Sequence, residues 1–272
     1  MKLLLIGHTS LIGSAILRHC LSIPTITSVV ILSRHPLSTA AGVPDDRIKV
    51  IVVDSFTFFD GDALQELEGA VGCLWQISPL ALRACLGSLK AKDTGDARKD
   101  SIDCTIAAAS AFSSYIAALN IPFEKGPFRF VCLNGMFPED VQKKRPGFTT
   151  GSHKMKGEIE TQLLALSKRS GNKFAAYIAR PGIVFRAETR CPKLLLTMLS
   201  GIKVDALAIC MVDCVIHGNP KNIIDHQELV DAGRMLLANM VDNDAERRKN
   251  LATDYNFDGN IHARRSTHDA IP

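Results

Sequence analysis

The chain has 272 residues, of which 46% are hydrophobic and 22% are charged, and its formal net charge is +4. A disordered chain would contain fewer apolar residues and carry more net charge, so this composition predicts a folded globular protein. The longest apolar runs fall far short of the roughly 20 residues that a membrane-spanning helix needs, and we expect no membrane insertion. The basic residues are scattered over separate stretches, which argues against a nucleic-acid partner.

Short apolar runs alternate with longer segments of helical spacing through the first two thirds of the chain. The runs predict strands at Leu3–Gly7, Ser28–Ser33, Ile48–Val53, Ala70–Leu74, Arg129–Leu133 and Phe174–Ala179. Helices are expected between them, at Leu11–Leu21, Asp60–Leu67, Arg98–Leu119 and Thr150–Ser170. Each strand-like run is apolar on both faces, as the strands of a covered parallel sheet are. The alternation predicts an α/β fold with a doubly wound parallel sheet.

The pattern is less regular after Arg180-Pro181-Gly182. Further helices are expected at Pro192–Leu199 and Gln227–Asn239, with an irregular apolar stretch between them. We therefore expect a single domain in three parts. These are a sheet-containing core over residues 1–185, a small irregular C-terminal lobe packed on it over 186–240, and a mobile polar tail over 241–272.

The first predicted strand ends in Gly7-His8-Thr9-Ser10-Leu11-Ile12-Gly13 and leads directly into a helix. In a Rossmann unit the first glycine of such a loop allows a tight turn, the last allows close helix–strand packing, and the helix N-terminus attracts phosphates. Glycines also serve plain turn geometry, but the position of this loop favours a dinucleotide site made by Gly7, Thr9, Ser10, Leu11, Ile12 and Gly13. Ser10 replaces the middle glycine and crowds the diphosphate, although its hydroxyl can donate to it. His8 is expected to be an exposed loop residue.

The second predicted strand ends in Ser33-Arg34-His35. An acidic residue at this point binds the ribose of NAD, whereas an arginine accommodates the 2′-phosphate of NADP. Ser33, Arg34 and His35 therefore favour NADP(H), with NAD(H) as the alternative. The alternative interpretation of Arg34, which the pattern favours less, is an exposed basic residue after a strand. Asp54 follows the third strand, at a position that commonly contacts the adenine edge. It is equally well explained as a turn residue.

Several motifs together resemble the atypical short-chain dehydrogenase/reductase superfamily. They are the glycine turn, Leu32-Ser-Arg34, Cys85-Leu-Gly-Ser88, Ser152-His-Lys-Met-Lys156-Gly-Glu-Ile-Glu160, Arg180-Pro-Gly182 and Arg186-Ala-Glu-Thr-Arg190. The branch it is most similar to holds the fungal mitochondrial-outer-membrane oxidoreductase-like proteins and the mammalian Tat-interactive oxidoreductase. The resemblance implies a Rossmann-like fold with Leu86, Gly87 and Ser88 beside the nicotinamide. It also implies a ribose contact from Lys156 and cofactor contacts from Pro181, Gly182 and Ile183.

The chain departs from this family at the catalytic positions. Family members use a Tyr as general acid four residues before the Lys, and here that position is Ser152. A Ser or Thr is usual after the fifth strand, where this chain has Asn134-Gly135-Met136. Serine is a poor proton donor compared with the tyrosine phenol. The candidate catalytic residues are therefore Lys156, Ser152, His153 as a titrating neighbour and Asn134 as a hydrogen-bond donor to a carbonyl. Glu158 and Glu160 are expected on a solvated helix face.

A segment without a counterpart in the family, Trp75–Ala84, follows the fourth strand. It is expected to be an insertion that contains the only Trp and that forms a lid, reshapes the substrate pocket or adds a surface turn. The eight cysteines include no Cys-x-x-Cys pair, and several lie in apolar runs. They are expected to be reduced core thiols, and no metal site is expected. With a strand beginning right after Met1, the default compartment is the cytoplasm.

The leading hypothesis is an NADP(H)-dependent oxidoreductase that reduces a small carbonyl or enone with a remodelled proton donor. The C-terminal lobe would line the substrate side. A second hypothesis is a non-redox cyclase, isomerase or dehydratase of a biosynthetic intermediate on the same scaffold, in line with fungal secondary metabolism. A third is a nucleotide-sensing regulatory protein. The expected partner is a small-molecule substrate, and a homodimer stays open.

Overall fold

The computed structural model describes residues 1–36, 45–76, 94–119, 126–134, 150–186 and 201–242. Within 94–101 and 150–156 it describes the backbone alone. The predicted Cys85–Ser88 loop, residues 77–84 of the predicted insertion, the predicted helix at 192–199 and residues 243–272 of the predicted tail lie outside the described residues.

A seven-stranded sheet with the strand order β3-β2-β1-β4-β5-β6-β9 forms the centre of the molecule, and every pairing in it is parallel. The strands are β1 (Lys2–Ile6), β2 (Ser28–Ser33), β3 (Ile48–Val52), β4 (Ala70–Trp75), β5 (Phe128–Leu133), β6 (Phe174–Ala179) and β9 (Ile223–Ile224). The order reverses between β1 and β4, which is the switch point of a doubly wound sheet. The predicted Rossmann-like α/β fold is therefore confirmed.

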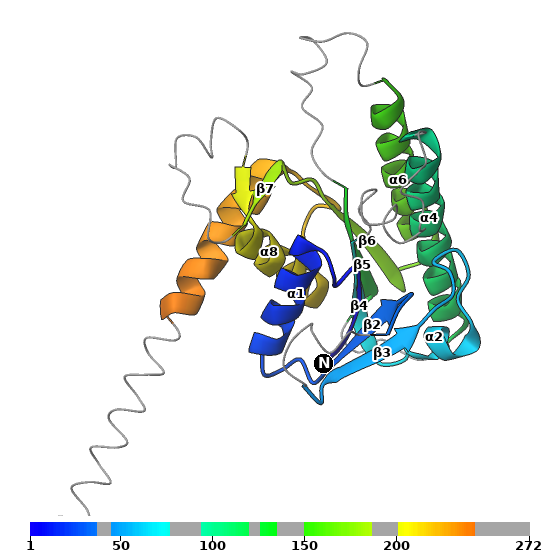
Figure 1. Cartoon of the computed structure of the whole chain (residues 1–272), viewed down its shortest axis with the longest axis horizontal. Helices are drawn as coiled ribbons and strands as arrows, with labels where there is room; N and C mark the ends of the chain where they lie inside the picture. Colours follow the sequence, from blue (N-terminus) through cyan, green and yellow to red (C-terminus); the bar gives the residue numbers. More distant parts are fainter. Residues whose placement is uncertain (37–44, 77–93, 120–125, 135–149, 187–200, 243–272) are drawn as a thin grey trace, which may run out of the picture.

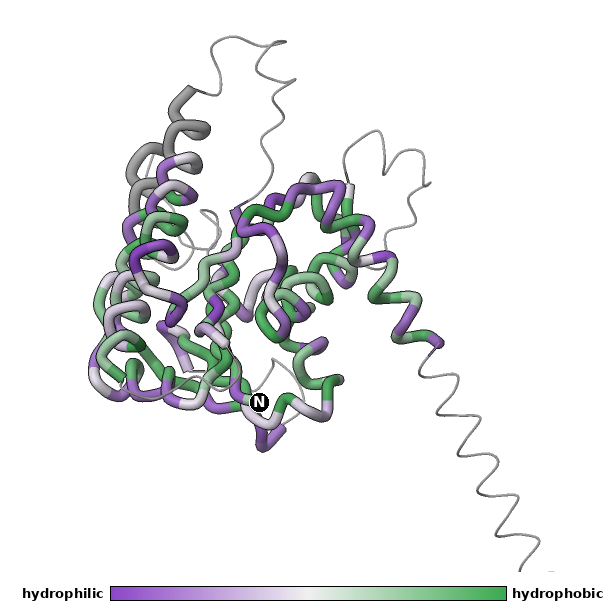
Figure 2. Tube along the Cα trace, turned by 180° about the vertical axis from the view of Figure 1, so that it is seen from behind, coloured by the Kyte–Doolittle hydropathy of each residue, from purple (hydrophilic) through white to green (hydrophobic). Residues whose placement is uncertain are grey.

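Helices cover both faces of the sheet (Figure 1). One face is covered by α1 (Leu11–Ser22) and α8 (Val204–His217), and the other by α2 (Gly61–Gln65), α4 (Thr94–Ala118) and α6 (Thr150–Arg169). Alternate residues of β1 show why its run is apolar throughout: Leu3 and Leu5 belong to the first layer, and Leu4 and Ile6 to the second. Hydrophobic residues accordingly follow the central strands along their whole length (Figure 2).

The stretch that the sequence pattern describes as irregular contains α8, so that expectation is wrong. Ten residues of α8 are buried, nine of them in the cluster that α8 forms with the sheet, α1 and the helix after β9. A helix that is apolar around most of its circumference has no polar stripe, and its period is therefore invisible in the sequence. Gly72 of β4 permits the close approach, because a Cβ there would lie 2.5 Å from Val215 Cγ2. The Arg129 guanidinium donates to the Ile216 carbonyl oxygen (3.0 Å) at the C-terminus of α8.

Two smaller features complete the C-terminal part. Strands β7 (Ile183–Phe185) and β8 (Gly201–Lys203) form a separate parallel pair. A helix over 226–242 follows β9 and agrees with the prediction of a helix at Gln227–Asn239. No helix among the described residues is both long and apolar enough to cross a membrane.

Trp75 is a core residue and not part of an inserted lid, which corrects the sequence interpretation. It is the last residue of β4 and 1% exposed. Its ring packs against Phe56 and Phe130, and its indole N–H donates to Thr105 Oγ1 of α4 (2.9 Å). The six described cysteines are buried free thiols, as expected of core positions. Burial raises the pKa of the Cys20 thiol to about 12.

Candidate functional site

The turn after β1 has the tight geometry that its two glycines predict. Gly7 has a φ of +86°, in the left-handed region that favours glycine. A Cβ on Gly7 would lie 1.9 Å from the Gln76 carbonyl oxygen, and one on Gly13 would lie 2.0 Å from the Gly7 carbonyl oxygen. The chain that leaves β1, the first turn of α1 and the end of β4 are thus packed backbone against backbone. No side chain fits at either glycine.

Ser10 is the N-cap of α1, and its hydroxyl is turned into the protein. Its Oγ accepts the Gly13 N–H (2.9 Å) and lies within donating distance of the Gly7 carbonyl oxygen (2.9 Å) and of Gln76 Oε1 (2.7 Å). Within the described part of the chain, the N–H groups of Leu11 and Ile12 have no hydrogen-bond partner. Unpaired N–H groups at a helix N-terminus are the groups that bind phosphate.

His8 is buried, so the expectation of an exposed loop histidine is wrong. It is 8% exposed, and burial lowers the pKa of its imidazole below the usual 6.5. At neutral pH the side chain is therefore uncharged and adds no positive charge to the turn. Thr9, its neighbour, is exposed.

Arg34 lies directly after β2, beside the glycine turn in the sheet order. Among the described residues, its Nε and Nη2 atoms are buried and have no hydrogen-bond partner. Buried polar atoms are nearly always paired, so a guanidinium left in this way is a candidate ligand contact. Ser33 is half-buried and accepts the His35 N–H (3.3 Å), while the His35 side chain and Asp54 are exposed.

A buried polar network joins α6 to the carboxyl ends of β5 and β6. The Asn134 amide donates to Glu160 Oε1 (2.8 Å), which also accepts the Arg180 Nε–H (2.8 Å). Arg180 Nη2 pairs with the second oxygen of Glu160, and Nη1 lies 3.4 Å from Asp225 Oδ1. Glu160 is 5% exposed, so its expected place on a solvated helix face is wrong, whereas Glu158 is exposed as expected.

The remaining predicted site residues divide into described and undescribed ones. Ser152, His153 and Lys156 lie in the first two turns of α6, where only the backbone is described. Pro181 is buried after β6, and the Gly182 N–H donates to His226 Nδ1 (3.0 Å). Ile183 begins β7 and is 51% exposed. Leu86, Gly87 and Ser88 lie outside the described residues.

The carboxyl ends of the parallel strands bring the described candidates to one edge of the sheet. The glycine turn follows β1, Arg34 follows β2, Asn134 follows β5 and Pro181 follows β6. Ligands of open α/β sheets bind at this edge, near the switch point. The sequence missed Gln76 and the Glu160–Arg180 pair, which bind partners far away in the chain. The one available signal for Gln76 was its place directly after β4.

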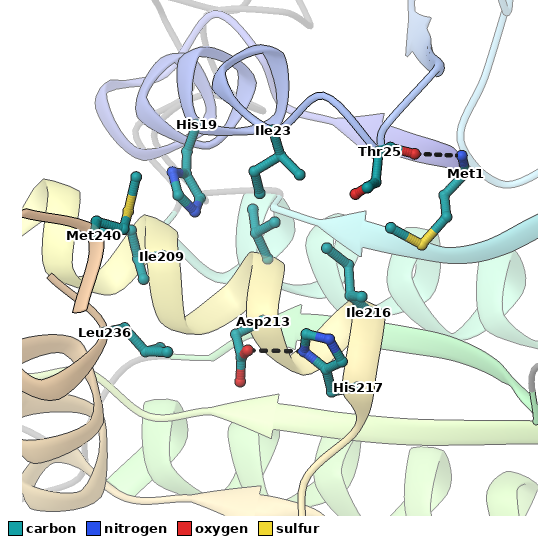
Figure 3. A pocket seen from close by; sticks show the side chains of 11 residues that line it. Met1, His19, Ile23, Thr25, Ile209, Asp213, Ile216, His217, Leu236 and Met240 are labelled. Carbon is teal, nitrogen blue, oxygen red and sulfur yellow. Dashed lines mark hydrogen bonds and ion pairs between the residues drawn. The ribbon is translucent and has the colours of Figure 1, made fainter. Parts of the chain in front are cut away.

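A separate cavity of about 230 Å³ lies at the opposite, amino edge (Figure 3). Met1, the end of α1, the second half of α8 and the end of the 226–242 helix line it, and most of its lining is apolar. Asp213 Oδ1 and His217 Nδ1 pair at its rim at 2.8 Å. None of the residues that line it is a predicted site residue.

Comparison with known proteins supports the fold. No protein-family model matches the chain. A protein named leucinostatins biosynthesis cluster protein T, from Purpureocillium lilacinum, is 28% identical over 199 residues. The matched region is 68% of this chain and 65% of that protein, slightly less than two thirds of the relative's length.

Two solved structures share the architecture at low identity. A reductase engineered to attenuate substrate inhibition in asymmetric catalysis has a TM-score of 0.57 and 14% identity, over 85% of this chain and 82% of that one. The UDP-glucuronic acid 4-epimerase of Bacillus cereus, in complex with UDP-glucuronic acid and NAD, has a TM-score of 0.51 and 15% identity, over 83% and 77%. At such identities the likeness concerns the fold. The chain therefore has the Rossmann-like scaffold that these reductase- and epimerase-type proteins share.

Proposed function

We propose that the protein is an NADP(H)-dependent oxidoreductase of the atypical short-chain dehydrogenase type that acts on a small carbonyl compound or enone. The observation that carries the proposal is the Arg34 side chain at the same sheet edge as the glycine turn, because its Nε and Nη2 atoms are buried and have no hydrogen-bond partner among the described residues. The structural neighbours include a reductase and an epimerase in complex with NAD, which supports nicotinamide chemistry on this scaffold.

The residues of the turn fit a dinucleotide diphosphate. Gly7 and Gly13 keep the backbone free of side chains, and the N–H groups of Leu11 and Ile12 are available for phosphate oxygens. The α1 N-terminus adds its partial positive charge. No acidic side chain occurs in the first turn of α1, so no carboxylate competes for this position.

Arg34 distinguishes NADP from NAD in this proposal. A 2′-phosphate on the adenosine ribose would accept hydrogen bonds from the two guanidinium nitrogens that the described protein leaves unpaired. The ribose hydroxyl of NAD offers no negative charge to such a group. We therefore expect a preference for NADP(H).

A bound nicotinamide would supply the hydride chemistry, and the chain's own residues would position the reactants. Lys156 would hold the nicotinamide ribose, as the family resemblance implies. Ser152 cannot match a tyrosine as a proton donor, which favours enones, whose reduction depends less on a strong acid at the carbonyl. The Asn134 amide donates to Glu160 Oε1, and in this proposal it also donates to the substrate carbonyl.

The first experiment measures binding of NADPH and NADH to the wild type and to Arg34→Met by fluorescence titration. We expect the wild type to prefer NADPH, and Arg34→Met to weaken NADPH binding by about 10- to 100-fold, with little change for NADH. Arg234→Met, which removes an exposed arginine from the 226–242 helix, is the control. Equal loss for both nucleotides would contradict the role of Arg34.

A second experiment follows NADPH oxidation with a panel of aldehydes, ketones and enones. Turnover with enones would support the proposed reaction. The serine at the tyrosine position favours a second candidate, a non-redox enzyme that processes a biosynthetic intermediate, and the name of the fungal relative agrees with a biosynthetic role. Tight NADPH binding without oxidation on any member of the panel would favour this second candidate.

A further inference from the structure

We propose that Ser10 and Gln76 form a pair that positions the phosphate-binding turn, in which Gln76 holds the Ser10 hydroxyl away from the face that receives the diphosphate. This inference rests on the proposed function, because it concerns the same dinucleotide site. It explains how the turn works with a serine where the glycine pattern has no side chain.

The contacts of Ser10 all lie on the protein side of the turn. Its hydroxyl oxygen accepts the Gly13 N–H, and its proton points to Gln76 Oε1 or the Gly7 carbonyl oxygen. The Gln76 contact is the shortest of the three, at 2.7 Å. A hydroxyl that donates here cannot at the same time donate to a phosphate, because it has a single proton.

Burial and a backbone hydrogen bond fix the position of Gln76. It is 3% exposed, and its N–H donates to the Ile6 carbonyl oxygen (3.2 Å), which ties it to the end of β1. Its side chain reaches beneath the turn so closely that a Cβ on Gly13 would lie 2.9 Å from Oε1. One residue therefore touches all three positions of the glycine pattern, Gly7 through its backbone and Ser10 and Gly13 through its side chain.

The N–H groups at the start of α1 therefore have two kinds of partner. The Ser10 hydroxyl satisfies the third N–H of α1 from below, and the N–H groups of Leu11 and Ile12 remain for the ligand. Without the Gln76 acceptor, the hydroxyl keeps only its contacts with the Gly13 N–H and the Gly7 carbonyl oxygen, and we expect it to sample rotamers on the diphosphate side as well. Gln76 thus acts as a positioning residue, through Ser10, and does not itself need to contact the cofactor.

A double-mutant cycle on NADPH affinity tests the pair. Gln76→Met keeps a side chain of similar length and removes the acceptor, and we expect it to weaken NADPH binding about tenfold. Ser10→Gly alone should bind at least as well as the wild type. The double variant should bind within about twofold of Ser10→Gly, because no hydroxyl is left to misplace. Gln227→Met, at an exposed position of the 226–242 helix, is the matched control.

Each outcome separates this inference from the proposed function. A wild type that binds neither NADPH nor NADH would overturn the proposed function itself. A wild type that binds NADPH, with Gln76→Met binding equally well or with no rescue in the double variant, would overturn the pair alone. A crystal structure of the wild type with NADP⁺ gives a test that needs no variant to fold. Ser10 Oγ is expected to keep its Gln76 contact, and a hydroxyl that donates to the diphosphate instead would overturn the inference.

Discussion

At the scale of single residues, the sequence pattern and the tertiary contacts give the same result for Gly7 and Gly13: both positions require glycine. Their spacing and their place after the first strand predicted a tight turn, and the structure adds the reason that neither tolerates a side chain. The obstacle at Gly7 is the Gln76 backbone, and at Gly13 it is the Gly7 backbone. Neither obstacle is the flexible end of a side chain that can move aside.

Gly7→Ala is expected to lower the free energy of unfolding by at least about 2 kcal/mol, because it combines a positive φ with a contact of 1.9 Å to a carbonyl oxygen. Urea unfolding measures the change. Gly61→Ala is the control, since nothing lies within 4 Å of a Cβ at that helical position. Equal stability of the two variants would mean that the turn does not have this geometry.

Glu160 could not be assigned correctly from its sequence context. It belongs to a glutamate-rich stretch of α6 that is typical of a solvated helix face, and its partners Asn134 and Arg180 lie 26 and 20 residues away. A buried carboxylate with such partners is inferred only when the strand ends are known to meet at one edge of the sheet.

Glu160→Gln should lower the free energy of unfolding by about 2 kcal/mol, because it leaves the half-buried Arg180 guanidinium without its main counter-charge. The double variant Glu160→Met/Arg180→Met should lose less free energy of unfolding than the losses of the single variants Glu160→Met and Arg180→Met add up to. Additive losses in urea unfolding would show that the two side chains do not interact.

At the scale of elements, the sequence predicted best where burial is one-sided or where strands are short and fully covered. Strands β1, β2, β5 and β6 are found close to their predicted bounds. Helix α8 was missed because ten of its residues are buried, which erases the helical period. Strand β9 has two residues, too few to give a pattern. Trp75 was misplaced because the match to a family loop took precedence over the continuous apolar run of β4.

The His226 side chain, at the start of the 226–242 helix, forms a hydrogen bond with the segment that follows β6. His226 Nδ1 accepts the Gly182 N–H, and burial lowers the pKa of this imidazole below 6.5. As the pH falls below 6.5, the unfolded chain takes up the proton first, so the free energy of unfolding decreases until the lowered folded pKa is reached. Well above pH 6.5 the imidazole is neutral in the folded and the unfolded chain, so it adds no pH dependence to the free energy of unfolding.

His226→Asn offers an amide oxygen as the acceptor but does not titrate. We therefore expect its melting temperature to fall less between pH 7 and pH 5 than that of the wild type, with His35→Asn, an exposed histidine, as the control. His8 and His19 keep their own lowered pKa values in all three proteins and contribute to the remaining slope. Parallel curves for the wild type and His226→Asn would exclude this coupling.

At the scale of the whole molecule, the two edges of the sheet have different character. The carboxyl edge holds the glycine turn, the Arg34 side chain, two of whose nitrogens have no partner in the described part of the chain, and the Glu160 network. The amino edge holds the apolar cavity beside Met1. The alternation of strands and helices was enough to predict the fold and therefore at which edge of the sheet a ligand is expected. The chemistry at that edge was less predictable, because Gln76 and Glu160 act through contacts between distant segments.

The most direct test of the account is an NMR titration of the isotope-labelled wild-type protein with NADPH, observed at the backbone amides. We expect the Leu11 and Ile12 amide signals to shift and saturate together with the Arg34 side-chain signal, since these groups would receive the diphosphate and the 2′-phosphate. Residues around the amino-edge cavity, such as Ile216 and Met240, should be unaffected. Saturable binding that leaves Leu11, Ile12 and Arg34 unchanged, or no binding at all, would contradict the account.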